Sequence, residues 1–151
     1  MGKAKRPWLK KLLIAFLVLV GIGAAIYFYI ALEKQPDTKN EKADFTVNAI
    51  DFIREFEKDD KAANKKYAEK IITVNGMVSE IEAVDTTVNI KFIDTTSGSY
   101  AIFAFQEQHV AEAKTVKVGD SVSIKGSCSG GILSEILGTE SITFKRCTLN
   151  K

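Results

Sequence analysis

The sequence predicts an α+β protein in which a β-barrel with helices follows a membrane-spanning helix. Three patterns predict this fold class: one long uncharged run, a segment with apolar residues three and four positions apart, and later segments where apolar and polar residues alternate. We expect a basic tail at residues 1–11, a transmembrane helix at 12–32, a linker at 33–43 and a folded domain at 44–151.

The uncharged run is long enough to cross a lipid bilayer. Its 21 residues would form a helix of roughly 30 Å, which matches the hydrocarbon thickness of a membrane. A cleaved signal peptide is the alternative, but its apolar region is usually about 7–15 residues long and ends at a small-x-small site. This run is longer and ends in the bulky stretch from Tyr27 to Leu32. We therefore expect a signal anchor that stays attached.

The distribution of charge predicts which side the domain faces. Five basic residues and no acidic residue precede the run: Lys3, Lys5, Arg6, Lys10 and Lys11. Basic flanks stay in the cytoplasm, so we expect a single-pass protein of the inner (cytoplasmic) membrane with a periplasmic or other extracytoplasmic domain. Beyond the run, 16 basic residues stand against 19 acidic ones, whereas the whole chain has a net charge of +2. The exported domain is thus slightly acidic, which argues against nucleic acid as its partner.

Two helices should open the domain after a polar, poorly ordered linker that includes Gln35 to Lys42. Thr46 is suited to cap the first helix. The apolar side of that helix would carry Val47, Ile50, Ile53 and Phe56. The second helix would run from Asp59 or Asp60 to about Glu69, with acidic residues at its start and lysines toward its end, as the helix dipole favours.

The alternating segments predict five β-strands. They cover approximately residues 70–78, 88–92, 100–105, 121–126 and 142–149. Gly76 inside the first strand indicates a bulge or a sharp bend. Gln106 to Thr115 lacks alternation and should form a short helix or a loop, and Lys125 of the fourth strand should face solvent. Five strands with an insertion between the third and the fourth are the order of an OB fold, a five-stranded Greek-key barrel.

Three segments also resemble a known family. Lys70 to Val78, Val118 to Gly130 and Ile142 to Leu149 resemble the bacterial tRNA_anti-like family of OB-fold proteins, and the resemblance spans about residues 46–150. It is carried by glycines, strand boundaries and two cysteines, with no catalytic signature. The resemblance implies the OB fold in a small exported or membrane-attached protein without an assigned activity. The family name implies a fold and not the binding of tRNA.

The two cysteines are candidates for a disulfide. If Cys128 and Cys147 face each other across a hairpin, its centre falls between Leu137 and Gly138. An oxidising compartment would allow the bond, which would stabilise the domain by roughly 3 kcal/mol in the chain-entropy model. The alternative is a pair of reduced, buried cysteines. With His109 as the only histidine, a closed four-ligand metal site is not expected.

The sequence predicts no enzymatic activity and no cofactor. It has no nucleophile motif of the G-x-S-x-G type and no phosphate-binding loop. Glu80 and Glu82 lie two residues apart on a strand, and together with His109 they are the candidates for a small hydrolase. Such carboxylate pairs are more often solvated surface, so we interpret the domain as a binding module.

An OB barrel usually binds its ligand on the face of its second and third strands. The candidate residues on that face are Lys91, Tyr100, Phe103 and Phe105, with Thr86 and Thr87 at the rim. Exposed aromatic rings there would stack on bases or sugars. Alternatively, Phe103 and Phe105 belong to the core, since the strand pattern allows either alternate set of residues to line the interior.

Three functions are therefore compatible with the sequence. The first is binding of another envelope protein or peptide, which the acidic and non-catalytic domain favours. The second is binding of an oligosaccharide or single-stranded nucleic acid on the barrel face, which requires exposed aromatic residues or clustered positive charge. The third is a small hydrolase. Besides the membrane itself, the expected partner is an envelope protein.

Overall fold

The structure is a computed structural model that describes residues 7–32 and 36–150. The chain forms two compact units, Met1–Gln35 and Pro36–Lys151. In the first unit, helix α1 (Pro7–Leu32) has no buried residue, and it is long and apolar enough to cross a membrane. The predicted apolar helix is confirmed and starts five residues earlier than expected. The basic residues up to Arg6 and the linker residues 33–35 lie outside the described residues.

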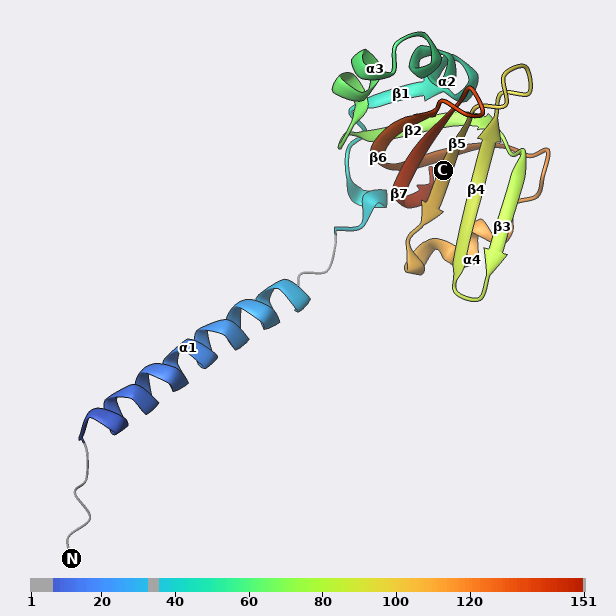
Figure 1. Ribbon diagram of the computed structural model, residues 1–151. Coiled ribbons are helices and arrows are strands. Elements are labelled where there is room, and N and C mark those ends of the chain that lie inside the picture. The colour runs from blue at the N-terminus through green and yellow to red at the C-terminus, as the bar shows by residue number, and fades with distance from the viewer. Residues whose placement is uncertain (1–6, 33–35, 151) are drawn as a thin grey trace, which may run out of the picture. The chain divides into compact units, whose positions relative to one another are not determined.

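The second unit is built on one seven-stranded sheet (Figure 1). Its strands are β1 (Phe45–Asn48), β2 (Ile71–Met77), β3 (Glu80–Val84), β4 (Thr87–Ile93), β5 (Tyr100–Phe105), β6 (Ser121–Ser134) and β7 (Thr139–Leu149). Their order in the sheet is β1-β2-β6-β7-β5-β4-β3. β1 pairs with β2 and β5 pairs with β7 in parallel, and the other pairs are antiparallel.

The expected count of five strands is wrong, because β1 adds an edge strand and one long strand is divided. β2 and β3 pair with different neighbours, yet only Val78 and Ser79 separate them. The Val78 N–H donates to the Asp120 carbonyl at 2.9 Å, just before β6, while the Ser79 N–H donates to the Lys91 carbonyl of β4 at 2.9 Å. The first half of this divided strand thus pairs with β6, and the second half pairs with β4. This arrangement curls the sheet into an OB-like fold.

Two helices, α2 (Ala49–Lys58) and α3 (Asp60–Tyr67), lie beside β1 and β2 (Figure 1). The cap of α2 is Asn48 and not Thr46: the Asn48 Oδ1 accepts the Ile50 N–H at 3.0 Å. Thr46 lies in β1 because this segment pairs with residues 72–75 of β2. The buried side of α2 consists of Ala49, Phe52, Ile53 and Phe56. The predicted apolar side was therefore correct only in its second half.

Helix α3 agrees with the prediction, and it also forms hydrogen bonds with the backbone of the neighbouring strand β6. Its buried residues are Ala63 and Tyr67. The Asn64 side chain donates to the Gly131 carbonyl at 3.0 Å and accepts the Gly131 N–H at 2.8 Å. One side chain therefore satisfies both backbone groups of a residue in β6.

Buried aromatic rings connect the helices to the inner side of the sheet. Ring centroids are 5.7 Å apart for Phe52 and Phe144, 4.6 Å for Phe144 and Phe103, and 4.9 Å for Phe103 and Phe92. Gly76 lies where α2 approaches β2, since a Cβ at this position would be 2.7 Å from the Ala49 Cβ. The glycine expected to mark a bend thus permits close contact between helix and strand.

The insertion after β5 forms a 3-10 turn, η2 (Glu107–His109), and a short helix, α4 (Val110–Ala113). This confirms the expectation for Gln106 to Thr115. β6 was expected to end near Gly126, but it continues to Ser134. Its longer second half forms the hairpin with β7.

Residues 36–42, here called the strap, pack on β6 and β7 within the second unit instead of forming a poorly ordered linker. The strap includes the 3-10 turn η1 (Thr38–Asn40), and Thr38 is fully buried. Lys125, expected in solvent, is 8% exposed, and its Nζ donates to the carbonyls of Lys39 at 2.9 Å and Glu41 at 2.8 Å. A buried ammonium group needs acceptors, and these two carbonyls supply them, so the hydrogen bonds of Lys125 hold the strap in place.

Lys125→Met should release the strap. Each hydrogen bond from a charged donor contributes about 1.5–3 kcal/mol, so we expect cleavage after Glu41 by glutamyl endopeptidase to become about tenfold faster or more. The rate of appearance of the fragment, followed by mass spectrometry, measures this. Lys117→Met removes an exposed lysine and should leave the rate unchanged. Equal rates for both variants would contradict the role of Lys125.

Candidate functional site

The sequence placed its candidate residues on β4 and β5, and the outward side of these strands continues onto β7. On these strands, alternate residues are buried and the residues between them are partly exposed. We call the partly exposed set the strand face: Lys91, Ile93, Tyr100, Ile102, Ser141 and Thr143. Cross-strand register brings these residues together, since Lys91 pairs with Ile102 and Ile102 pairs with Thr143.

Two of the four predicted face residues lie on this surface and two do not. The Lys91 ammonium is 5.5 Å from the centroid of the Tyr100 ring. Phe103 and Phe105 are buried in the core, whereas Ile102, which lies between the buried Ala101 and Phe103, is partly exposed. The hypothesis that their rings stack on a ligand is therefore wrong, and the core interpretation is confirmed.

The turn between β3 and β4 forms the rim expected at Thr86 and Thr87, and both residues are exposed. The Thr87 hydroxyl donates to the Val84 carbonyl at 2.9 Å, which closes the turn. Asp85 within it has a left-handed φ of 49°, a conformation that Asp tolerates better than most residues. The rim is thus built by local hydrogen bonding.

The charge of Lys91 is neutralised on the strand face. Its Nζ is 2.7 Å from Glu82 Oε1 and 3.6 Å from Glu80 Oε1. The hydrogen bond to Glu82 raises the pKa of Lys91, and the same bond lowers the pKa of Glu82. Both carboxylates proposed for a hydrolase are therefore ion-pair partners of Lys91. The lowered pKa of Glu82 is the opposite of what a general acid needs.

His109, the third hydrolase candidate, is a buried structural residue. Its Nε2 is 2.7 Å from Asp37 Oδ1 of the strap, and this hydrogen bond lowers the pKa of the Asp37 carboxyl. His109 and Glu82 thus have separate partners on different elements. The geometry gives the three candidates no shared catalytic arrangement.

A patch of exposed apolar residues adjoins the strand face, and sequence reasoning missed it. At the end of the β6–β7 hairpin, the exposed fraction is 76% for Ile132, 96% for Ile136 and 74% for Leu137, and Leu133 is also exposed. We call these four residues the hairpin tip. Ile132 pairs with Ser141, which pairs with Tyr100. The sequence contained a signal for this patch, because large apolar residues flank and occupy the turn at Glu135–Gly138.

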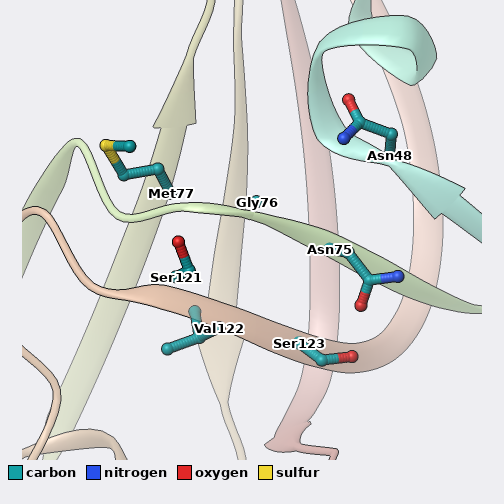
Figure 2. A pocket seen from close by; sticks show the side chains of 7 residues that line it. All are labelled: Asn48, Asn75, Gly76, Met77, Ser121, Val122 and Ser123. Carbon is teal, nitrogen blue, oxygen red and sulfur yellow. The ribbon is translucent and has the colours of Figure 1, made fainter.

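An open groove lies over β2 and the start of β6, and it too was missed. It has a volume of about 520 Å³. Figure 2 shows the seven residues that line it: Asn48, Asn75, Gly76, Met77, Ser121, Val122 and Ser123. They come from three separate segments of the chain, so no local motif could have indicated the groove.

Comparison with known proteins identifies the family. The profile described as tRNA_anti-like matches residues 1–142. The chain belongs to the tRNA_anti-like family. No curated protein matches it. The match confirms the resemblance seen in the sequence, and it includes the apolar helix that the resemblance left out.

A solved structure has the same fold as this tRNA_anti-like protein. It is a lipoprotein of Klebsiella pneumoniae subsp. pneumoniae MGH 78578 with an inferred nucleic acid-binding role. The two chains are 15% identical, the TM-score is 0.53, and the alignment covers 70% of this chain and 91% of the other. At this identity the likeness concerns the fold alone.

The two cysteines of the tRNA_anti-like protein are free and buried. Cys128 pairs with Phe144 and not with Cys147. The position of the hairpin centre accounts for two residues of this difference, and the bulge between Cys128 and Gly130 accounts for one. The hairpin centre lies between Ile136 and Leu137, since Ser134 pairs with Thr139. The expected direct pairing of Cys128 with Cys147 is therefore wrong, and the alternative of two reduced, buried cysteines describes the structure.

Burial also makes these thiols poor nucleophiles. It raises the pKa of the Cys128 thiol to about 11 and raises that of Cys147 as well. The thiolate is the reactive and metal-binding form, so both groups are inert at neutral pH. Among residues 7–32 and 36–150, no three His, Cys, Asp or Glu side chains are grouped to hold a metal ion.

Glu140 is a buried carboxyl that sequence reasoning missed. It is 1% exposed, and its Oε2 has no hydrogen-bond partner. Burial raises its pKa, with smaller contributions from Asp60 and Glu57. Its position could have been read from the strand pattern, because Glu140 has the same parity as the buried Ile142 and Phe144.

Glu140→Gln should be more stable than the wild type at pH 8 and equally stable near pH 4. A raised pKa in the folded state means that stability is complete at low pH and is lost as pH rises through the folded pKa. Glutamine cannot ionise and avoids this loss. Urea denaturation at both pH values measures the difference. Glu135→Gln, at an exposed site in the same hairpin, should show none. A constant difference at both pH values would contradict ionisation as its cause.

Proposed function

We propose that this chain is a membrane-anchored, extracytoplasmic OB-like module that binds another protein of the cell envelope and performs no catalysis. The observation that carries the proposal is the hairpin tip, where Ile136 is 96% exposed. Burying such apolar side chains is favourable by about 25 cal/mol per Å² of surface removed from water. Contiguous exposed apolar residues of this kind mark interaction sites.

The strand face supports a protein partner because it combines partly exposed apolar residues with a neutralised charge. Ile93, Tyr100 and Ile102 continue from the hairpin tip across β5 and β4. Lys91 is paired with two carboxylates. The centres of protein interfaces are depleted in charged residues and enriched in apolar and aromatic ones. The hairpin tip and strand face together have this composition.

The proposed location rests on α1 and on the charge around it. The basic residues before the apolar run favour a cytoplasmic N-terminus, and the structurally similar Klebsiella protein is a lipoprotein. Protease added to spheroplasts is expected to digest residues 36–151 while the membrane stays intact. Full protection of this unit would reverse the proposed orientation.

Nucleic acid is the second candidate, because the structurally similar lipoprotein has an inferred role in binding it. Binding to a polyanion requires unpaired basic residues, and its affinity falls as salt rises. The ammonium of Lys91 is already paired, and Phe103 and Phe105 are buried. We therefore expect no salt-dependent binding of a fluorescent dT20 oligonucleotide by the full chain.

A photo-crosslinking amino acid in place of Ile136 tests the proposal in living cells. The same amino acid in place of Lys61, exposed on α3, is the control. We expect one discrete protein adduct from position 136 and none from position 61. The adduct should disappear when Ile132 and Leu137 are changed to serine. Equal adducts from both positions, or adducts with nucleic acid or lipid alone, would overturn the proposal.

A further inference from the structure

The groove over β2 and β6 is separate from the hairpin tip and the strand face. It lies on the end of β2, the beginning of β6 and the turn that leads from β1 into α2 (Figure 2). We infer that this groove binds a neutral oligosaccharide. The inference rests on the chemistry of the lining and does not depend on the proposed protein partner.

A row of amide and hydroxyl side chains crosses the groove. Asn48 pairs with Asn75, and Asn75 pairs with Ser123, on three neighbouring strands. Neighbouring strands are about 4.8 Å apart, so the row offers hydrogen-bonding groups at regular intervals. Asn48 Oδ1 accepts the N–H groups of Ile50 and Asp51, which orients the amide and leaves its NH₂ group as a donor. Amides and hydroxyls both donate and accept, as sugar hydroxyls require.

The charge of the lining favours an uncharged ligand. None of the seven described lining residues is acidic or basic. A phosphate, carboxylate or ammonium group would lose its water without gaining a partner of opposite charge, which costs free energy. Met77 and Val122 add apolar surface beside the polar row, suited to contact the C–H groups of a sugar ring.

The backbone of the groove argues against an extended peptide. β2 and β6 pair with each other from Ile71 and Ser127 to Met77 and Ser121. Peptides that bind to sheets usually add a strand and use free backbone donors and acceptors. The backbone groups that β2 and β6 direct at each other are already engaged, so no strand can be added between them and recognition falls mainly to the side chains.

A second depression adjoins the groove and extends the surface open to a ligand. It has a volume of about 240 Å³, shares Ser121, Val122 and Ser123 with the groove, and continues to Leu149 and Asn150. The Asn150 N–H donates to the Ser123 carbonyl at 2.8 Å, which fixes the end of β7 along the groove. An oligosaccharide is therefore favoured over a single sugar.

Calorimetric titration of the full chain in lipid nanodiscs free of glycolipid tests this inference. The probes are maltohexaose, cellohexaose and chitohexaose, with a heparin hexasaccharide as the anionic comparison. We expect at least one neutral hexasaccharide to bind with a Kd below about 1 mM, and Asn75→Ala to weaken binding about tenfold through the loss of hydrogen bonds. Ser123→Ala should weaken the binding of the same sugar. It replaces Asn75→Ala as the test variant if Asn75→Ala does not fold.

Asn89→Ala is the matched control. Asn89 lies on β4, outside the groove, and is partly exposed, so its substitution should leave the Kd unchanged. The inference is overturned if none of the three neutral sugars binds, if the heparin fragment binds more tightly, or if Asn89→Ala weakens binding as much as Asn75→Ala. Binding of a neutral peptide to the same residues, without binding of sugar, would also overturn it.

Discussion

Phe103→Ala should lower the free energy of unfolding of the second unit by about 3–5 kcal/mol. The ring is fully buried, and its centroid is 4.6 Å from that of Phe144 and 4.9 Å from that of Phe92. Removal would leave a cavity between two rings that cannot both move inward. Urea denaturation of the full chain in nanodiscs, followed by circular dichroism of the β-sheet, measures the loss.

Tyr100→Ala is the control on the opposite side of the same strand. Its ring is partly exposed and stacks under the Lys91 ammonium, an interaction of about 0.5–1 kcal/mol at exposed sites. We expect a much smaller loss of stability than for Phe103→Ala. If the two substitutions cost the same, the assignment of Phe103 to the core and Tyr100 to the surface would be wrong.

Gly126→Ala is the second substitution with a large expected effect, about 3 kcal/mol of stability. A Cβ at this position would be 2.5 Å from the Cys147 Sγ and 3.3 Å from the Lys145 carbonyl oxygen. The neighbours are a fully buried thiol and backbone, neither of which can move away easily. The same urea titration measures the cost.

Combining Gly126→Ala with Cys147→Ala tests this cause. Removing the thiol creates room, so the double variant should lose less stability than the sum of the two single variants. Gly138→Ala is the control: Gly138 has a left-handed φ of 66° and no neighbour within 4 Å, so its cost should not depend on Cys147. An additive result for Gly126 would contradict the steric explanation.

The sequence allowed most elements to be predicted, and the errors have physical reasons. α1 and α3 and the main strands were found because each carries its own periodic pattern. β1 was assigned to a helix because Val47 continues the helical spacing of Ile53 and Phe56. Its true partner is β2, whose paired residues lie 27 positions further along the chain. The division into β2 and β3 was also invisible, since it depends on pairing with β6 and β4.

The candidate site was predictable only where one strand has a clear alternation. In β4, Lys91 lies between Ile90 and Phe92, so its outward position follows from the sequence. In β5 every residue from Tyr100 to Phe105 is apolar, and the inward set is decided by packing against β7. The cysteine register depends on the exact centre of the β6–β7 hairpin and on the bulge between Cys128 and Gly130. The groove depends on residues brought together by pairing.

The contact between Asn64 and Gly131 affects how the protein behaves among other copies of itself. Beyond its pairing with β2, β6 would present unpaired backbone groups next to an apolar hairpin end, a combination that invites strand-to-strand aggregation. The Asn64 amide occupies the donor and the acceptor of Gly131. The backbone of Gly131 therefore cannot pair with a strand of a neighbouring chain. We thus expect this one asparagine of α3 to limit the association of the protein with copies of itself.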